Sequence, residues 1–349
     1  MKAKNTKIEK RSTPALGLRD ARVLVTGGGG FLGKAIIKRL LTYTPHIRSL
    51  NRRYYADLDA RTVDQIQGDI RDPAAVEQAC QERDVVFHVA AKTDIWGVYQ
   101  TFYDTNVAGT QHVLTSCRKH GIPYLIYTSS PSVVHHGKRD VEGIDESAPY
   151  PDQHQTHYLK TKAMAEQLVL QTCDSRLRAI VLRPHLIWGP GDTHFVPRII
   201  ARAKSLRQVG NGKNLVDTTY IDNAALAHIL AAEKLVQNHR LSGRVYFISQ
   251  GEPIYLWDMV NHILSAAGKS PVTKSIPRGL AYAIGGILEF IYTCFRIRSE
   301  PKMTRFLANE LASHHWFDIS AAKKDLGYAP EVSIAEGLKQ LKEWMDSWN

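Results

Sequence analysis

A glycine-rich turn near the N-terminus constrains this chain more than any other feature of its sequence. Residues 22–26 (RVLVT) predict a buried strand, residues 26–33 read TGGGGFLG, and a helical pattern runs from residue 31 to 41. In G-x-x-G-x-x-G at such a junction, glycines allow a sharp turn, close approach of a diphosphate and tight packing of helix on strand. The helix N-terminus offers free N–H groups to phosphates. We therefore expect a dinucleotide to contact Gly27, Gly30, Phe31, Leu32 and Gly33.

Strand and helix patterns alternate along the first half of the chain. This alternation predicts right-handed βαβ units and an α/β fold with a doubly wound parallel sheet, the Rossmann fold. The expected further strands are 47–50, 84–89, 124–128 and 178–182, and the expected helices are 73–82, 104–119 and 156–172.

The regular alternation breaks after Pro184, where glycines, prolines and aromatic residues become frequent. Residues 245–249 predict a strand that returns to the main sheet, and the chain after residue 251 is mostly helical in pattern. We expect residues 1–20 to form a basic, flexible extension and residues 21–184 a Rossmann domain completed by about 216–250. Residues 185–215 and 251–349 should form a smaller, mostly helical substrate-binding cap.

Residues 280–295 (LAYAIGGILEFIYTCF) are almost entirely apolar. The segment is too short to span a membrane and contains a glutamate and a Gly-Gly pair. We expect a buried helix or a lid over an apolar substrate, and the alternative is shallow insertion into a membrane surface.

Composition narrows the partners of this chain. The formal net charge is +11, but the basic residues do not cluster with aromatic residues, which argues against nucleic-acid binding. An anionic substrate, an anionic cofactor or an acidic membrane surface fits the charge better. The four cysteines are widely spaced, so we expect neither disulfides nor a metal site, and a reducing cytoplasm. The first twenty residues lack the apolar core of a secretory signal. We also expect a homo-oligomer.

The end of the second strand predicts which nicotinamide cofactor binds. An acidic residue there would bind the ribose hydroxyls and repel a 2′-phosphate, but this chain has Asn51, Arg52 and Arg53. Two guanidinium groups suit a phosphate dianion, so we expect NADP(H) rather than NAD(H). The alternative is that both arginines are solvated surface charges.

Later strand ends complete the expected cofactor site. Asp69 follows the third strand, where its carboxylate can accept from the adenine amino group, and Ile70 can lie against the ring. The small residues Ala90 and Ala91, followed by Lys92, end the fourth strand and let ribose and nicotinamide pass close to the backbone.

The catalytic candidates are a tyrosine, a lysine and a serine. Tyr158 and Lys162 lie four residues apart on a predicted helix, so the ammonium should lower the pKa of the phenol. Ser130, at the end of the fifth strand, can donate to a substrate oxygen, and Ser129 is its rival. Asn106 is a candidate for holding a water or Lys162 in a proton relay, or it is a helix-packing amide.

These motifs resemble the extended short-chain dehydrogenase/reductases. The resemblance covers nearly the whole chain from Arg22, and residues 211–230 point to the 3β-hydroxysteroid dehydrogenase/isomerase branch. Residues 90–97, 128–137, 182–192 and 304–317 are most similar to bacterial reductases of 2-alkyl-3-oxoalkanoates in long-chain olefin biosynthesis. The matching stretches include TGGGGFLG (26–33), GD (68–69), YTSS (127–130), YLKTK (158–162) and LRPHLIWGPGD (182–192).

The resemblance implies a division of roles. Tyr158 would be the proton donor, Lys162 would orient the ribose and tune the tyrosine, and Ser130 would hold the carbonyl. Pro184 would begin the loop around the nicotinamide. Asn51 and Arg52 stand where many steroid-acting members carry an acidic residue, which favours an NADPH-dependent reductase.

The expected substrate is a lipid-like, long-chain 2-alkyl-3-oxo acid, reduced to the 3-hydroxy acid with NADPH. Association with other enzymes of the same pathway and peripheral membrane contact through residues 280–295 are further expectations. His185, His154 and His157 are candidate partners of the carboxylate, although packing or surface roles are the alternative.

Three other functions remain open at this point. The first is a sterol-4-carboxylate dehydrogenase that decarboxylates its product. Its substrate has the same 3-hydroxy (or 3-oxo) acid unit as the expected substrate, so the catalytic residues do not separate the two functions. A nucleotide-sugar epimerase or dehydratase fits poorly with an apolar cap. An NADP(H)-binding redox sensor without turnover is disfavoured by the intact Ser130, Tyr158 and Lys162.

Overall fold

The computed structural model describes residues 17–135 and 140–347. Most of the extension expected at residues 1–20 therefore lies outside the described residues. Its last four residues form a turn in which Leu18 is fully buried. Residues 17–20 thus already belong to the packed fold, and the proposed domain limits stay a prediction.

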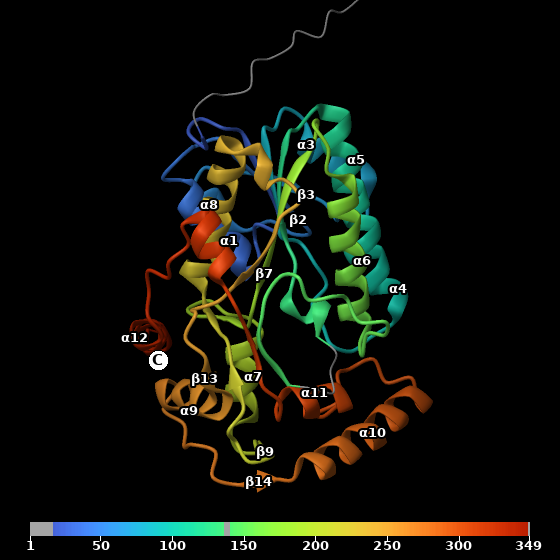
Figure 1. Ribbon diagram of the computed structural model, residues 1–349, viewed down its shortest axis with the longest axis vertical. Coiled ribbons are helices and arrows are strands. Elements are labelled where there is room, and N and C mark those ends of the chain that lie inside the picture. The colour runs from blue at the N-terminus through green and yellow to red at the C-terminus, as the bar shows by residue number, and fades with distance from the viewer. Residues whose placement is uncertain (1–16, 136–139, 348–349) are drawn as a thin grey trace, which may run out of the picture.

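A seven-stranded parallel sheet lies at the centre of the protein, as the alternating pattern predicts (Figure 1). Its strand order is β12-β7-β5-β4-β1-β2-β3. The chain adds β2 and β3 on one side of β1 and then adds β4 and the later strands on the other side, as in doubly wound folds. The strands are β1 (Val23–Thr26), β2 (Ile47–Asn51), β3 (Asp64–Gln67), β4 (Val85–His88), β5 (Tyr124–Thr128), β7 (Arg178–Pro184) and β12 (Val245–Ile248).

Helices cover both faces of this sheet. Helices α1 (Phe31–Leu40) and α8 (Ile221–Gln237) pack together on one face, and α3 (Pro73–Cys80), α5 (Gly109–His120) and α6 (His157–Thr172) cover the other (Figure 1). The short helices α2 (Ala56–Asp59) and α4 (Tyr99–Phe102) lie in connections. The helix expected at 104–119 begins as a π-helix, Tyr103–Ala108, before continuing as α5.

The strands have buried apolar side chains on both faces, and this explains why helices must cover both. Val23 and Val25 of β1 belong to the cluster beneath α1 and α8, whereas Leu24 between them belongs to the cluster beneath α3, α5 and α6. Such runs are typical of parallel sheets buried between two helical layers. The sheet thereby holds its carboxyl ends, where ligands bind in these folds, in fixed positions.

The cap is mostly helical, as expected, but it also contains small sheets that the sequence did not predict. A four-stranded sheet has the order β13-β10-β15-β6, and β6 comes from within the range assigned to the Rossmann domain. The cap strands are β6 (Val141–Ile144), β8 (Ile187–Trp188), β9 (Gln208–Val209), β10 (Leu215–Val216), β11 (Thr219–Tyr220), β13 (Ile254–Tyr255), β14 (Ser275–Ile276) and β15 (His315–Phe317). Its helices are α7 (Phe195–Arg202), α9 (Leu256–Ala266), α10 (Arg278–Cys294), α11 (Arg305–Glu310) and α12 (Ile334–Asp346).

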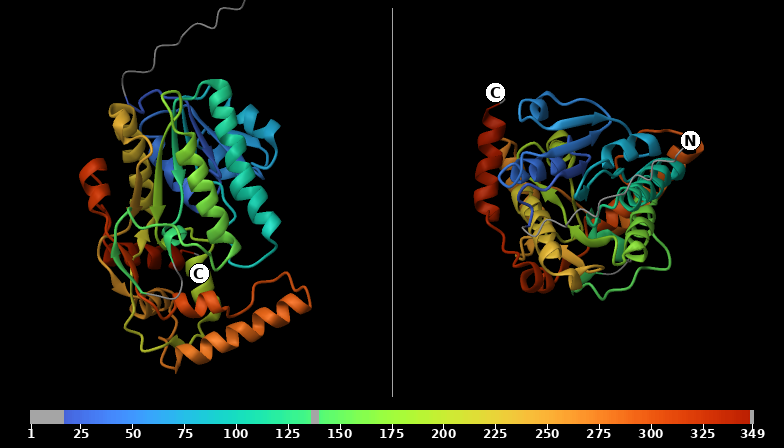
Figure 2. Two further views of the ribbon diagram at one scale, coloured as in Figure 1. Left: turned by 45° about the vertical axis from the view of Figure 1, so that its right-hand side comes forward. Right: turned by 90° about the horizontal axis from the view of Figure 1, so that it is seen from above.

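The apolar segment at 280–295 forms helix α10, but the expectation of a buried helix is wrong. Figures 1 and 2 show α10 at the outer edge of the cap, and only Ala281 and Gly285 within it are buried. Gly285 lies so close to Thr304 that a Cβ would collide with its backbone, so this glycine allows α10 to pack on α11. Large apolar side chains face solvent: Phe290 is 70% exposed and Ile287 is 60% exposed. Among the described residues, no helix is long and apolar enough to cross a membrane.

Candidate active site

The glycine-rich turn has the geometry of a phosphate cradle. Gly27 has a φ of +72° and its N–H bonds to the carbonyl of Leu50 at 2.9 Å. A Cβ at Gly33 would come within 2.2 Å of the Gly27 carbonyl oxygen, and a Cβ at Gly27 would meet the backbone of Ala90. Larger residues at these two positions would therefore push the turn away from α1 and from the end of β4. The residues present fit the diphosphate of a dinucleotide.

Asn51 joins the end of β2 to this turn. Its Oδ1 accepts a hydrogen bond from the backbone N–H of Gly29 at 2.7 Å. The side chain is buried, and its Nδ2 has no hydrogen-bond partner within the described residues. A buried donor without a partner fits a ligand oxygen at this point, which agrees with a ribose or phosphate group.

The two arginines after Asn51 are exposed at the same strand end. Arg53 donates from Nε to the hydroxyl of Tyr55 at 3.2 Å, and the Tyr55 ring lies directly against Gly29. A hydrogen bond from Arg71 is the main cause that lowers the pKa of Asp69, and Arg52 is close enough to add to this effect. Both guanidinium groups thus lie at the strand end where the sequence predicts a 2′-phosphate, and that contact stays a prediction.

The other expected cofactor residues lie along the same edge. Asp69 pairs with Arg71 through both carboxylate oxygens, and Ile70 is buried against Gly109 of α5. Ala90 packs on Gly27, and Ala91 and Lys92 follow it at the end of β4. Pro184 ends β7, paired with Ile248 of β12. Their contacts with a cofactor stay predictions.

Ser130 and Tyr158 come together at the carboxyl end of β5. Ser130 caps a 3₁₀ turn over Pro131–Val134 by accepting from the N–H of Ser132 at 3.3 Å. Tyr158 lies in the first turn of α6, which Thr156 caps by accepting from Leu159 N–H. Burial raises the pKa of Tyr158, and an interaction with the Ser130 hydroxyl partly opposes that rise. The two hydroxyl groups thus lie close together at this strand end, and their roles toward a substrate stay a prediction.

Lys162 does not lower the pKa of Tyr158 in the way the four-residue spacing suggested. Its ammonium donates to the Thr128 carbonyl oxygen at 2.6 Å and to the Tyr127 hydroxyl at 2.8 Å. Burial lowers the pKa of Lys162 itself to about 7, and Glu166 raises it in part. Burial and the Ser130 hydroxyl, rather than Lys162, are the causes of the shifted pKa of Tyr158.

Asn106 contacts the backbone rather than Lys162. Its Oδ1 accepts from Lys92 N–H at 2.7 Å, and its Nδ2 donates to the Lys92 carbonyl and to the Thr161 hydroxyl, each at 3.0 Å. It lies in the π-helix, a feature frequent at functional sites. Asn106 therefore ties the loop after β4 to α6, one residue before Lys162, and its part in a proton relay stays a prediction.

Sequence reasoning missed the buried network behind Lys162. Glu166 is fully buried and binds Arg183 of β7 through both oxygens, and it also accepts from the Tyr150 hydroxyl at 2.6 Å. The sequence does contain a signal for Glu166, because Tyr158, Lys162 and Glu166 follow one another at four-residue intervals along one helix face. Arg183 and Tyr150 had no such signal.

The three candidate histidines separate in the structure. His185 is buried at the end of β7, whereas His157 is exposed at the start of α6 and packs against Tyr99 and Phe102. His154 lies between them in exposure, in the loop before α6. Only His185 is therefore enclosed at the carboxyl edge of the main sheet.

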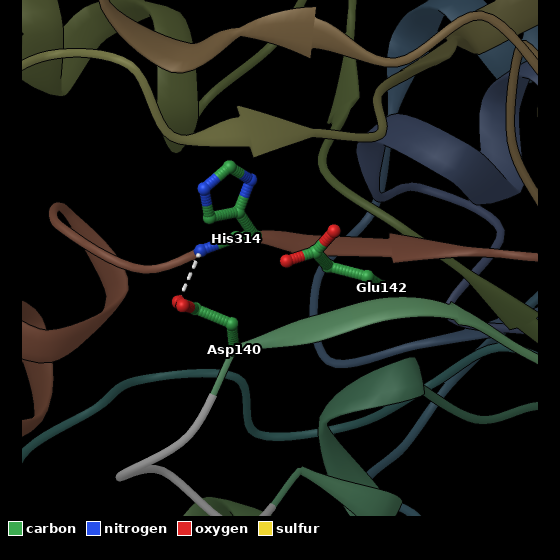
Figure 3. Close-up of side chains that lie close together, drawn as sticks. All are labelled: Asp140, Glu142 and His314. Atoms are coloured by element: carbon green, nitrogen blue, oxygen red, sulfur yellow. Dashed lines mark hydrogen bonds between the residues drawn. The ribbon is translucent and has the colours of Figure 1, made fainter.

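One trio of side chains in the cap has the spacing of a cation site. Asp140, Glu142 and His314 each offer a ligand atom within 4.8 Å of the others, as Figure 3 shows. Asp140 accepts a hydrogen bond from the backbone N–H of His314 at 2.9 Å. Both carboxylates are exposed, and exposed acidic groups are common without a metal, so we assign no metal to the trio.

Comparison with known proteins decides the family. The sequence profile of the 3-beta hydroxysteroid dehydrogenase/isomerase family matches residues 24–278. The chain belongs to this family. The members are oxidoreductases, and the chain has the nicotinamide-dinucleotide-binding fold of short-chain dehydrogenases.

Curated relatives match over nearly the full chain. It is 48% identical over 324 residues to the 2-alkyl-3-oxoalkanoate reductase of Stenotrophomonas maltophilia, covering 92% of this chain and 98% of that protein. The reductase of the same name from Shewanella oneidensis is 45% identical, with 96% and 89% covered. The decarboxylating sterol-4-alpha-carboxylate 3-dehydrogenase of Candida albicans is 34% identical, with 93% and 97% covered.

Solved structures support the fold. The UDP-glucuronic acid 4-epimerase from Bacillus cereus, in complex with NAD, superimposes with a TM-score of 0.71 at 23% identity. The match covers 93% of this chain and 99% of that chain. At this identity the likeness shows the fold alone, which confirms the expected α/β architecture with its C-terminal cap.

Proposed function

We propose that this protein reduces long-chain 2-alkyl-3-oxoalkanoates to 2-alkyl-3-hydroxyalkanoates with NADPH, a step of long-chain olefin formation. The observation that carries the proposal is the meeting of Ser130 and Tyr158 at the carboxyl end of β5. It is supported by the 48% identity to a reductase of such acids that this chain spans almost completely.

The chemistry divides between the cofactor and the chain. NADPH, when bound, supplies the hydride for C3 of the substrate. Tyr158 donates the proton that the carbonyl oxygen requires, so that a ketone becomes an alcohol. Ser130 donates a hydrogen bond to the same oxygen and stabilises the negative charge that develops there. Because the Ser130 hydroxyl can also turn to Ser132 at 3.2 Å, it has an alternative acceptor before substrate arrives.

Lys162 and Asn106 keep this arrangement in place. Lys162 ties α6 to the last carbonyl of β5, and Asn106 ties the loop after β4 to the same helix. The two contacts set the position of Tyr158 relative to the strand end that carries Ser130. A misplacement of about 1 Å is enough to reduce turnover strongly.

The preference for NADPH over NADH rests on the end of β2. Asn51 is neutral and already used by the glycine turn, so no carboxylate there would repel a 2′-phosphate. Arg52 and Arg53 are exposed beside it, where each can form a bidentate pair with a phosphate.

Helix α10 gives this enzyme a route to water-insoluble substrates. Its exposed apolar side chains are bordered by Arg278 and Arg296, which suits an acidic membrane surface. The indole of Trp96, in the loop after β4, bonds to the Ile297 carbonyl just beyond α10 at 3.4 Å. We propose peripheral membrane contact through α10, and self-association and contact with pathway enzymes remain predictions.

A second candidate is oxidation of a 3-hydroxysterol 4-carboxylate with loss of carbon dioxide. The 34% identity to a sterol-4-alpha-carboxylate 3-dehydrogenase favours it over the nucleotide-sugar reactions. Both substrates present a 3-oxo or 3-hydroxy acid unit, so Ser130 and Tyr158 serve either.

A cofactor-consumption assay tests these alternatives together. NADPH and NADH are each supplied with a 2-alkyl-3-oxo acid, and NADP⁺ and NAD⁺ with a 4-carboxysterol. We expect turnover with the 3-oxo acid and NADPH. Faster turnover of the carboxysterol would reject the proposed substrate, and a tenfold preference for NADH, about 1.4 kcal/mol, would reject the cofactor assignment.

A further inference from the structure

Four titratable side chains that the proposed reaction does not use gather beside the candidate active site. His135 follows the turn that Ser130 caps, and His185 follows Pro184 at the end of β7. Glu310 ends α11, and His315 lies on β15. The three imidazoles are buried, and the rings of His185 and His315 are 5.0 Å apart.

The hydrogen bonds in this cluster fix where the protons are. His315 Nε2 lies 3.0 Å from the backbone carbonyl of Glu310, which can only accept, so this nitrogen carries the proton. The Nδ1 of a neutral His315 is then an acceptor, and it lies 3.3 Å from His185 Nε2. His185 Nε2 must donate, and a neutral His185 therefore has a bare Nδ1.

That bare nitrogen is the unusual feature of the cluster. His185 Nδ1 is buried and has no hydrogen-bond partner within the described residues. Leaving a buried polar atom unpaired destabilises a folded protein, and most buried polar atoms have a hydrogen-bond partner. The His185 ring also packs edge-to-face on the ring of Phe317, with the two ring centroids 5.2 Å apart, and this neighbour offers no hydrogen-bond donor.

Strand geometry places His185 near the substrate carbonyl. Arg183 of β7 points to α6, where it binds Glu166, and residues two apart on a strand share a face. His185 continues the ladder by donating its N–H to Ile248, so its side chain is on the face that carries Tyr158 and Lys162. Thr128 of β5 pairs with Leu182 of β7, so Ser130 is level with Pro184, roughly one strand spacing of 5 Å away.

We propose that His185 recognises the carboxylate of the substrate. This inference rests on the proposed function, because it requires a substrate whose carboxylate lies two bonds from the carbonyl carbon. Its carboxyl carbon is two bonds from the keto carbon, roughly 2.5 Å, so a carbonyl held by Ser130 brings the carboxylate to the end of β7. His185 takes up one proton from solvent as the anion binds, and Nδ1–H then donates to a carboxylate oxygen.

The neighbouring charges fit this proton uptake. Burial and the nearby His315 and His135 hold the pKa of His185 well below its usual value, so the imidazole is neutral before substrate binds. Burial alone would raise the pKa of Glu310, but the adjacent His135 outweighs it and the pKa falls to about 2. Glu310 therefore keeps a negative charge in the cluster and pairs with His135 Nδ1 at 2.7 Å. Together with the substrate anion, it can stabilise an imidazolium at position 185.

Calorimetry on the protein saturated with NADP⁺ tests the inference directly. The probes are the branched acid 2-hexyldecanoate and the matched alcohol 2-hexyldecanol, which has no charge. In buffers of different ionisation enthalpy, we expect uptake of about one proton per acid bound and none for the alcohol. The dissociation constant of the acid should rise about tenfold per pH unit around neutral pH, since neutral His185 must first be protonated.

Variants connect the proton to the residue. His185→Asn should bind the acid at least tenfold more weakly, without proton uptake, and bind the alcohol unchanged. His262→Asn, at an exposed position on α9, is the matched control and should behave as the unmodified protein. His157→Asn tests the exposed rival at the start of α6 and should also leave acid binding unchanged.

The outcomes separate the two proposals. Acid binding without proton uptake, acid binding no tighter than alcohol binding, or proton uptake that survives in His185→Asn would each overturn the role of His185. Because the uptake is measured on the unmodified protein, its absence overturns this role even if His185→Asn does not fold. Turnover of a 2-alkyl-3-oxo acid in the cofactor assay judges the proposed function separately.

Discussion

The ammonium nitrogen of Lys162 lies 2.6 Å from the carbonyl oxygen of Thr128, the last residue of β5. This contact ties the helix that carries Tyr158 to the strand that leads into Ser130. It also takes Lys162 away from the phenol and into a buried environment, where the pKa of Lys162 falls to about 7. The lysine is therefore a structural tie whose charge changes within the physiological range.

Replacing Lys162 with methionine should reveal that charge. Because the pKa of Lys162 is lowered by burial, the unfolded chain holds more protons than the folded protein above about pH 7. The cost of burying the ammonium is full below that pH and fades as pH rises. The stability difference between Lys162→Met and the unmodified protein should therefore shift by about 2 kcal/mol, in favour of the unmodified protein, between about pH 7 and 9.

Urea unfolding at several pH values measures this shift. Lys160→Met, an exposed lysine on the same helix, is the matched control and should give a constant difference. A difference for Lys162→Met that also stays constant with pH would show that the lysine remains fully charged in the folded protein.

Arg52→Ala should weaken NADPH binding more than NADH binding. The lost guanidinium would cost about 1.5–3 kcal/mol if it forms a charged hydrogen bond with the 2′-phosphate. Fluorescence titration with both cofactors gives the two dissociation constants, and Arg61→Ala, an exposed arginine after α2, controls for the loss of charge. If the binding of NADPH and of NADH were weakened equally, Arg52 would be a solvated surface charge.

Asn106→Leu should lower turnover without removing any group that contacts substrate. The variant removes the side-chain partner of the Lys92 N–H and carbonyl and one hydrogen bond to the Thr161 hydroxyl, which costs about 1–3 kcal/mol of stability. We expect kcat to fall while the pH dependence of turnover is unchanged, since Asn106 carries no titrating proton. A shifted pH profile would place Asn106 in the proton relay instead.

Charged residues on the outer face of α10 should abolish membrane binding. The double substitution of Ile287 and Phe290 by glutamate places two negative charges where apolar side chains now face solvent. Sedimentation with acidic phospholipid vesicles should lose the bound fraction, and turnover of a short, water-soluble 3-oxo acid should be unchanged. Tyr255→Glu, at an exposed aromatic residue on β13, is the control. If the double variant bound vesicles as well as the unmodified protein, membrane contact through α10 would be contradicted.

The sequence predicted the main sheet well because its signals are local. The apolar run before Gly27 and the four-residue spacing of Tyr158 and Lys162 each lie within one βα unit, and their positions follow from backbone geometry. The burial of α10 was predicted wrongly for the converse reason. An apolar segment indicates that a surface is covered, but not whether the covering comes from the same chain.

The histidine cluster could not be predicted as a cluster. His185 was singled out because it follows Pro184, but His135, Glu310 and His315 come from three segments that the small cap sheet brings together. The sequence did not predict that sheet, whose strands are too short for a periodic signal. The orientation of Lys162 was missed for a similar reason, because a carbonyl on β5 rather than helix spacing decides where its ammonium lies.

Tyr158→Phe tests the central claim, that one phenol donates the proton to the substrate carbonyl. The variant should keep its fold and its affinity for NADPH while turnover of a 2-alkyl-3-oxo acid falls by about 10²–10⁴-fold. Tyr255→Phe, an exposed tyrosine on β13, should retain full activity. If Tyr158→Phe instead turned over the acid at the rate of the unmodified protein, with NADPH bound normally, another group would have to supply the proton.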